Sequence, residues 1–67
     1  MISIRLNHDP LQLQDGATLA ALVASLDKPP AALATAVNGD FIAREQRDRC
    51  VLRDGDFVMT FEPITGG

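Results

Sequence analysis

The stretch Thr18-Leu19-Ala20-Ala21-Leu22-Val23-Ala24-Ser25-Leu26 decides the fold that we predict for this chain. Its four large apolar residues recur at i, i+3, i+4 and i+7, the spacing of one apolar helix face, and its alanines favour helix. Thr18 is placed to cap this helix at its start. Because Pro29-Pro30 prevents continuation, we predict a helix from Leu19 to Leu26 or Asp27.

The residues before this helix predict a hairpin. Apolar and polar residues alternate over Ile2–Leu6 and again over Leu11–Leu13, the period-two pattern of half-buried strands. The residues between them, Asn7-His8-Asp9-Pro10, are typical of a turn, and Asp15-Gly16 ends the second strand.

The residues after the prolines predict three more strands. Leu33 to Val37 is typical of a short strand, and Asn38-Gly39 is a strong signal for a hairpin turn into Phe41-Ile42. The turn Asp54-Gly55-Asp56 leads into the last predicted strand, Phe57–Phe61, in which residue types again alternate.

This order of elements predicts an α+β fold in which one helix packs across a mixed sheet. A right-handed crossover favours a last strand that lies parallel to the first, in the middle of the sheet, which is the β-grasp (ubiquitin-like) arrangement. We expect a β-grasp domain over residues 1–62 and a flexible C-terminal tail over residues 63–67.

Composition narrows the class of protein. A chain of 67 residues with 46% hydrophobic and 22% charged residues is typical of one small globular domain. A net charge of -3 argues against a nucleic-acid partner, which would require a basic surface. The sequence has no apolar run long enough to span a membrane, so we expect no membrane partner and a cytoplasmic location.

We find no catalytic constellation and no metal site in the sequence. His8 is the single histidine and falls in a predicted turn, while Cys50 is the single cysteine and is expected to pack in the core with Val51 and Leu52. Acidic residues interleave with four of the six basic residues over 44–56, which predicts a solvated, salt-bridged surface. Within it, Arg44 to Arg49 has no apolar residue and is expected to be a loop or a single helical turn. A nucleotide-binding loop is also missing, so a bound cofactor is not expected.

The candidate site is the terminal segment Pro63-Ile64-Thr65-Gly66-Gly67. Five extended residues reach about 17 Å, and glycines without Cβ atoms can enter a narrow channel, so the Gly67 carboxylate could reach another protein's active site. A carboxylate becomes a useful acyl donor only after activation, for example as an adenylate, which a sulfur nucleophile could convert to a thiocarboxylate. A frayed end or a cloning remnant is the plain alternative.

This chain resembles the ThiS family of sulfur carriers in the order and spacing of its short motifs. The motifs that carry the resemblance are Val37-Asn38-Gly39, Arg44-Glu45, Asp54-Gly55-Asp56 and Gly66-Gly67. The resemblance implies a β-grasp carrier whose Gly67 is adenylylated by a ThiF-type enzyme, with Gly66 giving access. It implies a thiocarboxylate made with a cysteine desulfurase system and used by the thiazole synthase ThiG. Ala43 departs from the proline that relatives often have.

Two alternatives share this tail and fold. One is a carrier similar to MoaD, the small subunit of molybdopterin synthase, and the other is a ubiquitin-like modifier or a plain binding module. For the partner surface we expect the sheet face away from the helix, with Val58 and Thr60, and the tail residues Ile64 and Thr65. Ile64 is the best candidate for an apolar anchor, although it could instead pack on its own sheet.

Overall fold

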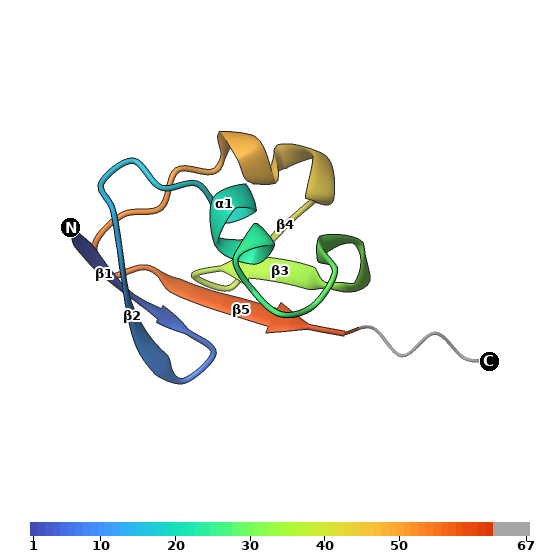
Figure 1. Cartoon of the computed structure of the whole chain (residues 1–67), viewed down its shortest axis with the longest axis horizontal. Coiled ribbons are helices and arrows are strands. Elements are labelled where there is room, and N and C mark those ends of the chain that lie inside the picture. The colour runs from blue at the N-terminus through green and yellow to red at the C-terminus, as the bar shows by residue number, and fades with distance from the viewer. Residues whose placement is uncertain (63–67) are drawn as a thin grey trace.

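The computed structural model describes residues 1–62, which form a mixed sheet with one α-helix across it (Figure 1). The elements are β1 (Ile2–Leu6), β2 (Asp9–Leu13), α1 (Leu19–Ala24), η1 (Pro30–Ala32), β3 (Ala34–Val37), β4 (Asp40–Ile42), η2 (Arg44–Arg49) and β5 (Phe57–Phe61), where η marks 3-10 helices. The five strands lie in the order β2-β1-β5-β3-β4. β5 runs parallel to β1 and antiparallel to β3, which confirms the predicted β-grasp topology.

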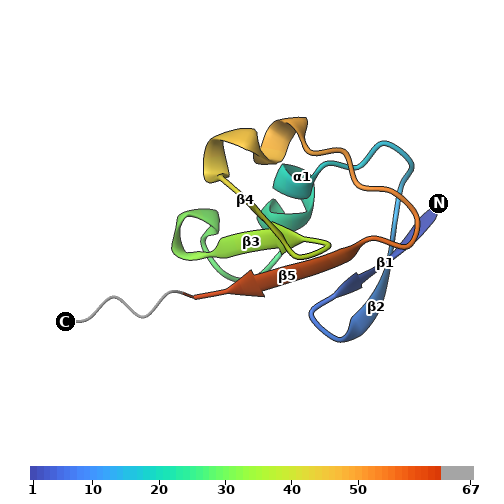
Figure 2. The ribbon, with the colours of Figure 1, turned by 180° about the vertical axis from the view of Figure 1, so that it is seen from behind.

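The helix α1 covers one face of this sheet. Figures 1 and 2 show α1 and η2 on the same side of β3 and β5, and Leu19, Leu22 and Val23 of α1 are buried there. Thr18 caps α1 as predicted, because its Oγ1 accepts a hydrogen bond from Ala21 N at 3.1 Å.

The helix ends earlier than predicted, at Ala24 instead of Leu26 or Asp27. The Ser25 hydroxyl donates to Leu22 O at 2.6 Å, and the Ser25 N–H bonds both Ala21 O and Leu22 O. This bonding tightens the last turn and closes the helix before the prolines are reached.

Both predicted hairpins are present, and the first turn is tighter than expected. Asn7 and His8 alone connect β1 and β2, while Asp9 and Pro10 already pair with β1. Proline is tolerated there because β2 is an edge strand. In the second hairpin Asn38 and Gly39 have φ values of 53° and 87°, the left-handed conformations that a two-residue turn of this kind requires.

The basic segment differs most from its prediction. It forms η2, and Arg47 within it is only 4% exposed, whereas we expected a solvated, salt-bridged surface. Arg47 is buried because backbone carbonyl groups satisfy its guanidinium: Nη1 donates to Pro30 O at 3.0 Å, and Nη2 donates to Leu33 O. Among the described residues the ion pairs lie elsewhere, at the N-terminus with Asp15 and between Lys28 and Glu62.

The return from η2 to the sheet is partly as predicted. Leu52 is buried, and Cys50 is half-buried against the core. Val51, however, is 54% exposed, so its predicted place in the core is wrong. Val51 instead forms an isolated antiparallel bridge with Thr18, which anchors the segment to the start of α1 through the backbone.

Candidate functional site

The residues that the sequence singled out in the tail lie outside the described part of the chain. These residues are Ile64, Thr65, Gly66 and Gly67. The structure does describe the end of the domain just before the tail, namely Phe61 at the end of β5 and Glu62 after it. The candidate site is therefore built from the two faces of the sheet at this end of β5.

The two faces of β5 are assigned by burial. Val58 is fully buried in the core beneath α1, and Thr60 is half-buried on the same side, whereas Met59 and Phe61 are 41% and 46% exposed. The expectation that Val58 contacts a partner is therefore wrong, because its side chain has no exposed surface to offer. The pattern of β5 could not reveal this, since both of its faces carry apolar residues.

Strand register gathers an apolar patch on the face away from the helix. Phe41 of β4 and Met59 of β5 both pair with Ala36 of β3, and Phe61 pairs with Ala34. Directly paired residues share a face, so these side chains lie around two small alanines. We call Phe41, Met59 and Phe61 the open-face patch; Phe41 is its most exposed member at 68%.

Sequence reasoning missed the exposed position of Phe41 on the open face. A signal was available, because Phe41 is a large aromatic residue in the second position of a three-residue edge strand after a tight turn. Such a short edge strand can bury few side chains in the core. An aromatic side chain there is a candidate for contact with another molecule.

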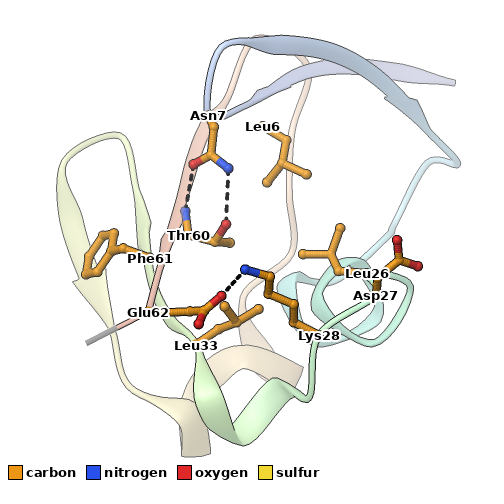
Figure 3. A pocket seen from close by; sticks show the side chains of 9 residues that line it. All are labelled: Leu6, Asn7, Leu26, Asp27, Lys28, Leu33, Thr60, Phe61 and Glu62. Atoms are coloured by element: carbon orange, nitrogen blue, oxygen red, sulfur yellow. Dashed lines mark hydrogen bonds and ion pairs between the residues drawn. The ribbon is translucent and has the colours of Figure 1, made fainter. Parts of the chain in front are cut away.

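The helix-side face has a pocket of about 350 Å³ at the end of β5 (Figure 3). Its apolar lining comes from Leu6, Leu26 and Leu33. Lys28, from the segment after α1, forms an ion pair with Glu62 across the pocket. The pocket therefore lies between the end of β5 and the loop that follows the helix.

Thr60, a predicted partner contact, lies in this pocket rather than on the open face. Its N–H donates to Asn7 Oδ1 at 3.0 Å, and its Oγ1 accepts from Asn7 Nδ2 at 3.2 Å (Figure 3). Both polar groups of Thr60 are thus occupied by a neighbour in its own chain. The structure gives Thr60 a role in holding β5.

The reactive side chains of the described domain are poorly placed for catalysis. Burial raises the pKa of the Cys50 thiol above its usual value of 9.0, and the nearby Asp56 carboxylate raises it further, which disfavours the nucleophilic thiolate. His8 contacts Phe57 edge to face, with ring centroids 6.4 Å apart. In residues 1–62 we find no group of three His, Cys, Asp or Glu side chains that could hold a metal ion, and no helix long and apolar enough to cross a membrane.

Comparison with known proteins places this chain in a family. The sequence model of the ThiS family matches residues 4–67. The sulfur carrier protein ThiS of Escherichia coli strain K12 is 33% identical over 66 residues, which covers 98% of this chain and 100% of that protein. The crystal structure of the thiamine biosynthesis protein ThiS from Geobacter metallireducens has a TM-score of 0.82 and 26% identity, and covers 98% of this chain and 100% of its own.

These similarities extend over nearly the whole chain, in sequence and in fold. They favour the ThiS resemblance over the molybdopterin-synthase and modifier alternatives. The chain belongs to the ThiS family, and it is a small sulfur carrier of thiamine biosynthesis.

Proposed function

We propose that the carrier bears its sulfur at the carboxyl group of Gly67. A carboxylate oxygen attacks the α-phosphorus of ATP on a ThiF-type enzyme, which releases pyrophosphate and leaves an acyl adenylate. A sulfur nucleophile from a cysteine desulfurase system then attacks the acyl carbon and AMP leaves. If the sulfur arrives as a persulfide, its attack forms an acyl disulfide, and a second thiol must then cleave the S–S bond, which releases the thiocarboxylate and leaves a disulfide on the donor.

The resulting thiocarboxylate is the sulfur donor for thiazole formation by ThiG. Its anionic sulfur is a strong nucleophile, whereas the original carboxylate is a poor one. In this scheme the carrier is a co-substrate of its partner enzymes and binds no cofactor of its own.

One observation carries the proposal. The match to the ThiS family runs to residue 67, so Gly66 and Gly67 lie within the matched region. This supports the functional reading of the tail over a frayed end or a cloning remnant. Glycines suit the role because a residue without Cβ can approach a bound nucleotide closely.

We further propose that the open-face patch docks the activating enzyme, with Ile64 and Thr65 as additional contacts. Phe61 precedes Gly67 by only six residues in the sequence. Six extended residues span at most about 20 Å, so an enzyme that holds Gly67 must lie within this distance of Phe61. An exposed apolar patch at that distance is suited to such a contact.

Intact-mass measurement tests the proposal. The carrier is incubated with its ThiF-type enzyme, ATP and a sulfur source, and we expect a mass change equal to one oxygen replaced by sulfur, located at Gly67 by fragmentation. A variant that lacks Gly67 serves as the matched control and should remain unmodified. Modification of that truncated variant would contradict the proposal.

Two further outcomes separate the alternatives. A stable amide between Gly67 and lysines of other proteins would indicate a ubiquitin-like modifier. In a genetic test, the carrier should rescue a thiazole requirement. Rescue of a molybdopterin requirement alone would favour the MoaD-like function.

A further inference from the structure

We propose that Asn7 is a positioning residue for the carrier reaction, because its side chain fixes the end of β5 and so sets where the tail segment begins. This inference rests on the proposed function of Gly67. Asn7 lies far from Gly67 in the sequence, and it acts through β5 rather than on the reacting atoms.

The ladder between β1 and β5 is short. Its two rungs pair Arg5 with Phe57 and Leu6 with Val58, and β1 ends at Leu6, while β5 continues to Phe61. The last part of β5 therefore has a strand neighbour on the β3 side only. A strand edge without a neighbour is the part of a sheet that frays most easily.

Asn7 replaces the missing strand on that edge. Its N–H donates to Val58 O at 2.8 Å, and its side-chain Oδ1 then accepts from Thr60 N at 3.0 Å. The side-chain Nδ2 donates to Thr60 Oγ1 at 3.2 Å. The amide of Asn7 thus acts as a further rung of the ladder, two residues beyond the last true strand pair.

A second side chain secures the next position on the same edge. Glu62 follows Thr60 by two residues, and Lys28 contacts its carboxylate from the segment after α1 (Figure 3). This pair is exposed and worth little by itself. Asn7 supplies the half-buried part of the restraint, and Lys28 extends it to the last described residue.

The backbone of Asn7 is consistent with this role. Its φ of 61° lies in the left-handed region, which glycine adopts most readily and asparagine tolerates. A two-residue turn by itself would accept glycine at this position. The asparagine side chain adds the two contacts to Thr60, and these are what a glycine would lose.

Loss of these contacts has a specific expected effect on the reaction. Without them, Phe61 and Glu62 lose a fixed backbone conformation, and the activating enzyme must immobilise them again when it binds Gly67. The free-energy cost of immobilising these residues weakens binding of the carrier to the enzyme, since the chemistry at the carboxylate is unchanged. The KM for the carrier should therefore rise about five-fold or more, with kcat nearly constant.

The chain provides a matched control at the other end of β5. Asn38 also has a positive φ, 53°, and its Oδ1 accepts from Phe57 N at 3.0 Å while its Nδ2 donates to Asp56 Oδ1 at 3.1 Å. Asn38→Gly therefore removes the same kind of contact from the same strand. It does so at the end remote from the tail.

The experiment compares Asn7→Gly, Asn7→Asp and Asn38→Gly in the full chain. Carrier-dependent pyrophosphate release by the activating enzyme, measured with the sulfur source present so that the enzyme turns over, gives KM and kcat, and amide hydrogen exchange reports on β5. We expect Asn7→Gly to raise KM and to speed exchange at Thr60, and Asn38→Gly to speed exchange at Phe57 without raising KM. Asn7→Asp should restore KM, because its carboxylate accepts from both Thr60 N and the Thr60 hydroxyl.

Each outcome decides the inference. Equal KM values for Asn7→Gly and the unaltered carrier, or a rise in KM that Asn38→Gly reproduces, would overturn it. Unchanged exchange at Thr60 in Asn7→Gly would overturn it even without the enzyme. If the unaltered carrier gives no adenylate at all, the proposed function fails, and the exchange measurement still decides whether Asn7 holds β5. Should Asn7→Gly not fold, Thr60→Val removes one of the two contacts and is expected to show a smaller rise.

Discussion

Arg47 donates a hydrogen bond from Nε to Thr35 Oγ1 over 3.1 Å, between two side chains that are 4% and 0% exposed. The Thr35 hydroxyl in turn donates a hydrogen bond to Ile42 O at 3.0 Å. No carboxylate among the described residues pairs with this guanidinium, so neutral oxygens hold its charge. This network joins η2 to the segment before β3 and to both strands of the second hairpin.

Replacement of Arg47 by alanine should destabilise the fold strongly. It would leave Thr35 Oγ1 and Leu33 O without their donor, while Pro30 O keeps the hydrogen bond from Leu33 N, and buried groups that lose a charged partner cost about 2–4 kcal/mol in the free energy of unfolding. Urea unfolding followed by circular dichroism measures the loss. The control is Arg49→Ala, an exposed change in the same helix, which should stay within about 0.5 kcal/mol. Equal urea midpoints for the two variants would show that the network is unimportant.

Val58 and Met59 are neighbours with opposite expected phenotypes. Val58→Ala leaves a cavity under α1 and should cost about 1–3 kcal/mol of unfolding free energy while affinity for the activating enzyme is kept. Met59→Asp should leave stability nearly unchanged and weaken that affinity about ten-fold, since a charge would have to be desolvated on the open-face patch. Calorimetric titration with the enzyme measures the affinity. An unaltered affinity in Met59→Asp would place docking elsewhere.

Cys50 should make stability fall at alkaline pH. The folded state raises the pKa of this thiol, so it holds the proton more tightly than the unfolded chain, whose value lies near 9.0. The stability that the protonated thiol contributes is fully present below the pKa of the unfolded chain. It is lost as the pH rises through the higher pKa of the folded state. Urea midpoints of the unaltered chain and Cys50→Ser, compared from neutral to alkaline pH, should therefore converge as pH rises.

The same variant separates structure from sulfur chemistry. Cys50→Ser should still gain sulfur at Gly67, because its thiol is no part of the proposed reaction. Parallel pH curves for the two proteins would contradict the assigned burial of Cys50. Loss of sulfur transfer in a folded variant would give the thiol a role that the proposed function does not include.

The fold was largely predictable because its decisive signals are local. The apolar spacing of residues 19–26, the Asn38-Gly39 turn and the alternation in β1 act within a few residues, and crossover handedness then limits the topology. The end of α1 was predicted less well, because a serine hydroxyl bonded to the helix backbone closed it before the prolines could.

The chemistry of the tail stays a prediction from the sequence, and the surface beside it was predicted less well than the fold. Gly66-Gly67 can be read directly from the sequence. The outward face of β5, in contrast, depends on where α1 packs, and the sequence does not reveal this because both faces of β5 carry apolar residues. Arg47 shows the same limit. A guanidinium among acidic neighbours looks solvated in the sequence, and only the fold brings three backbone or hydroxyl oxygens around it.

The central position of β5 also bears on biosynthesis. β5 is the last strand to leave the ribosome, yet it alone connects the first hairpin to the second through backbone pairing. A nascent chain that stops before Phe57 cannot unite its two hairpins, and exposed unpaired strand edges of that kind are prone to aggregation. The stability of this fold therefore depends on synthesis through β5, which ends six residues before Gly67.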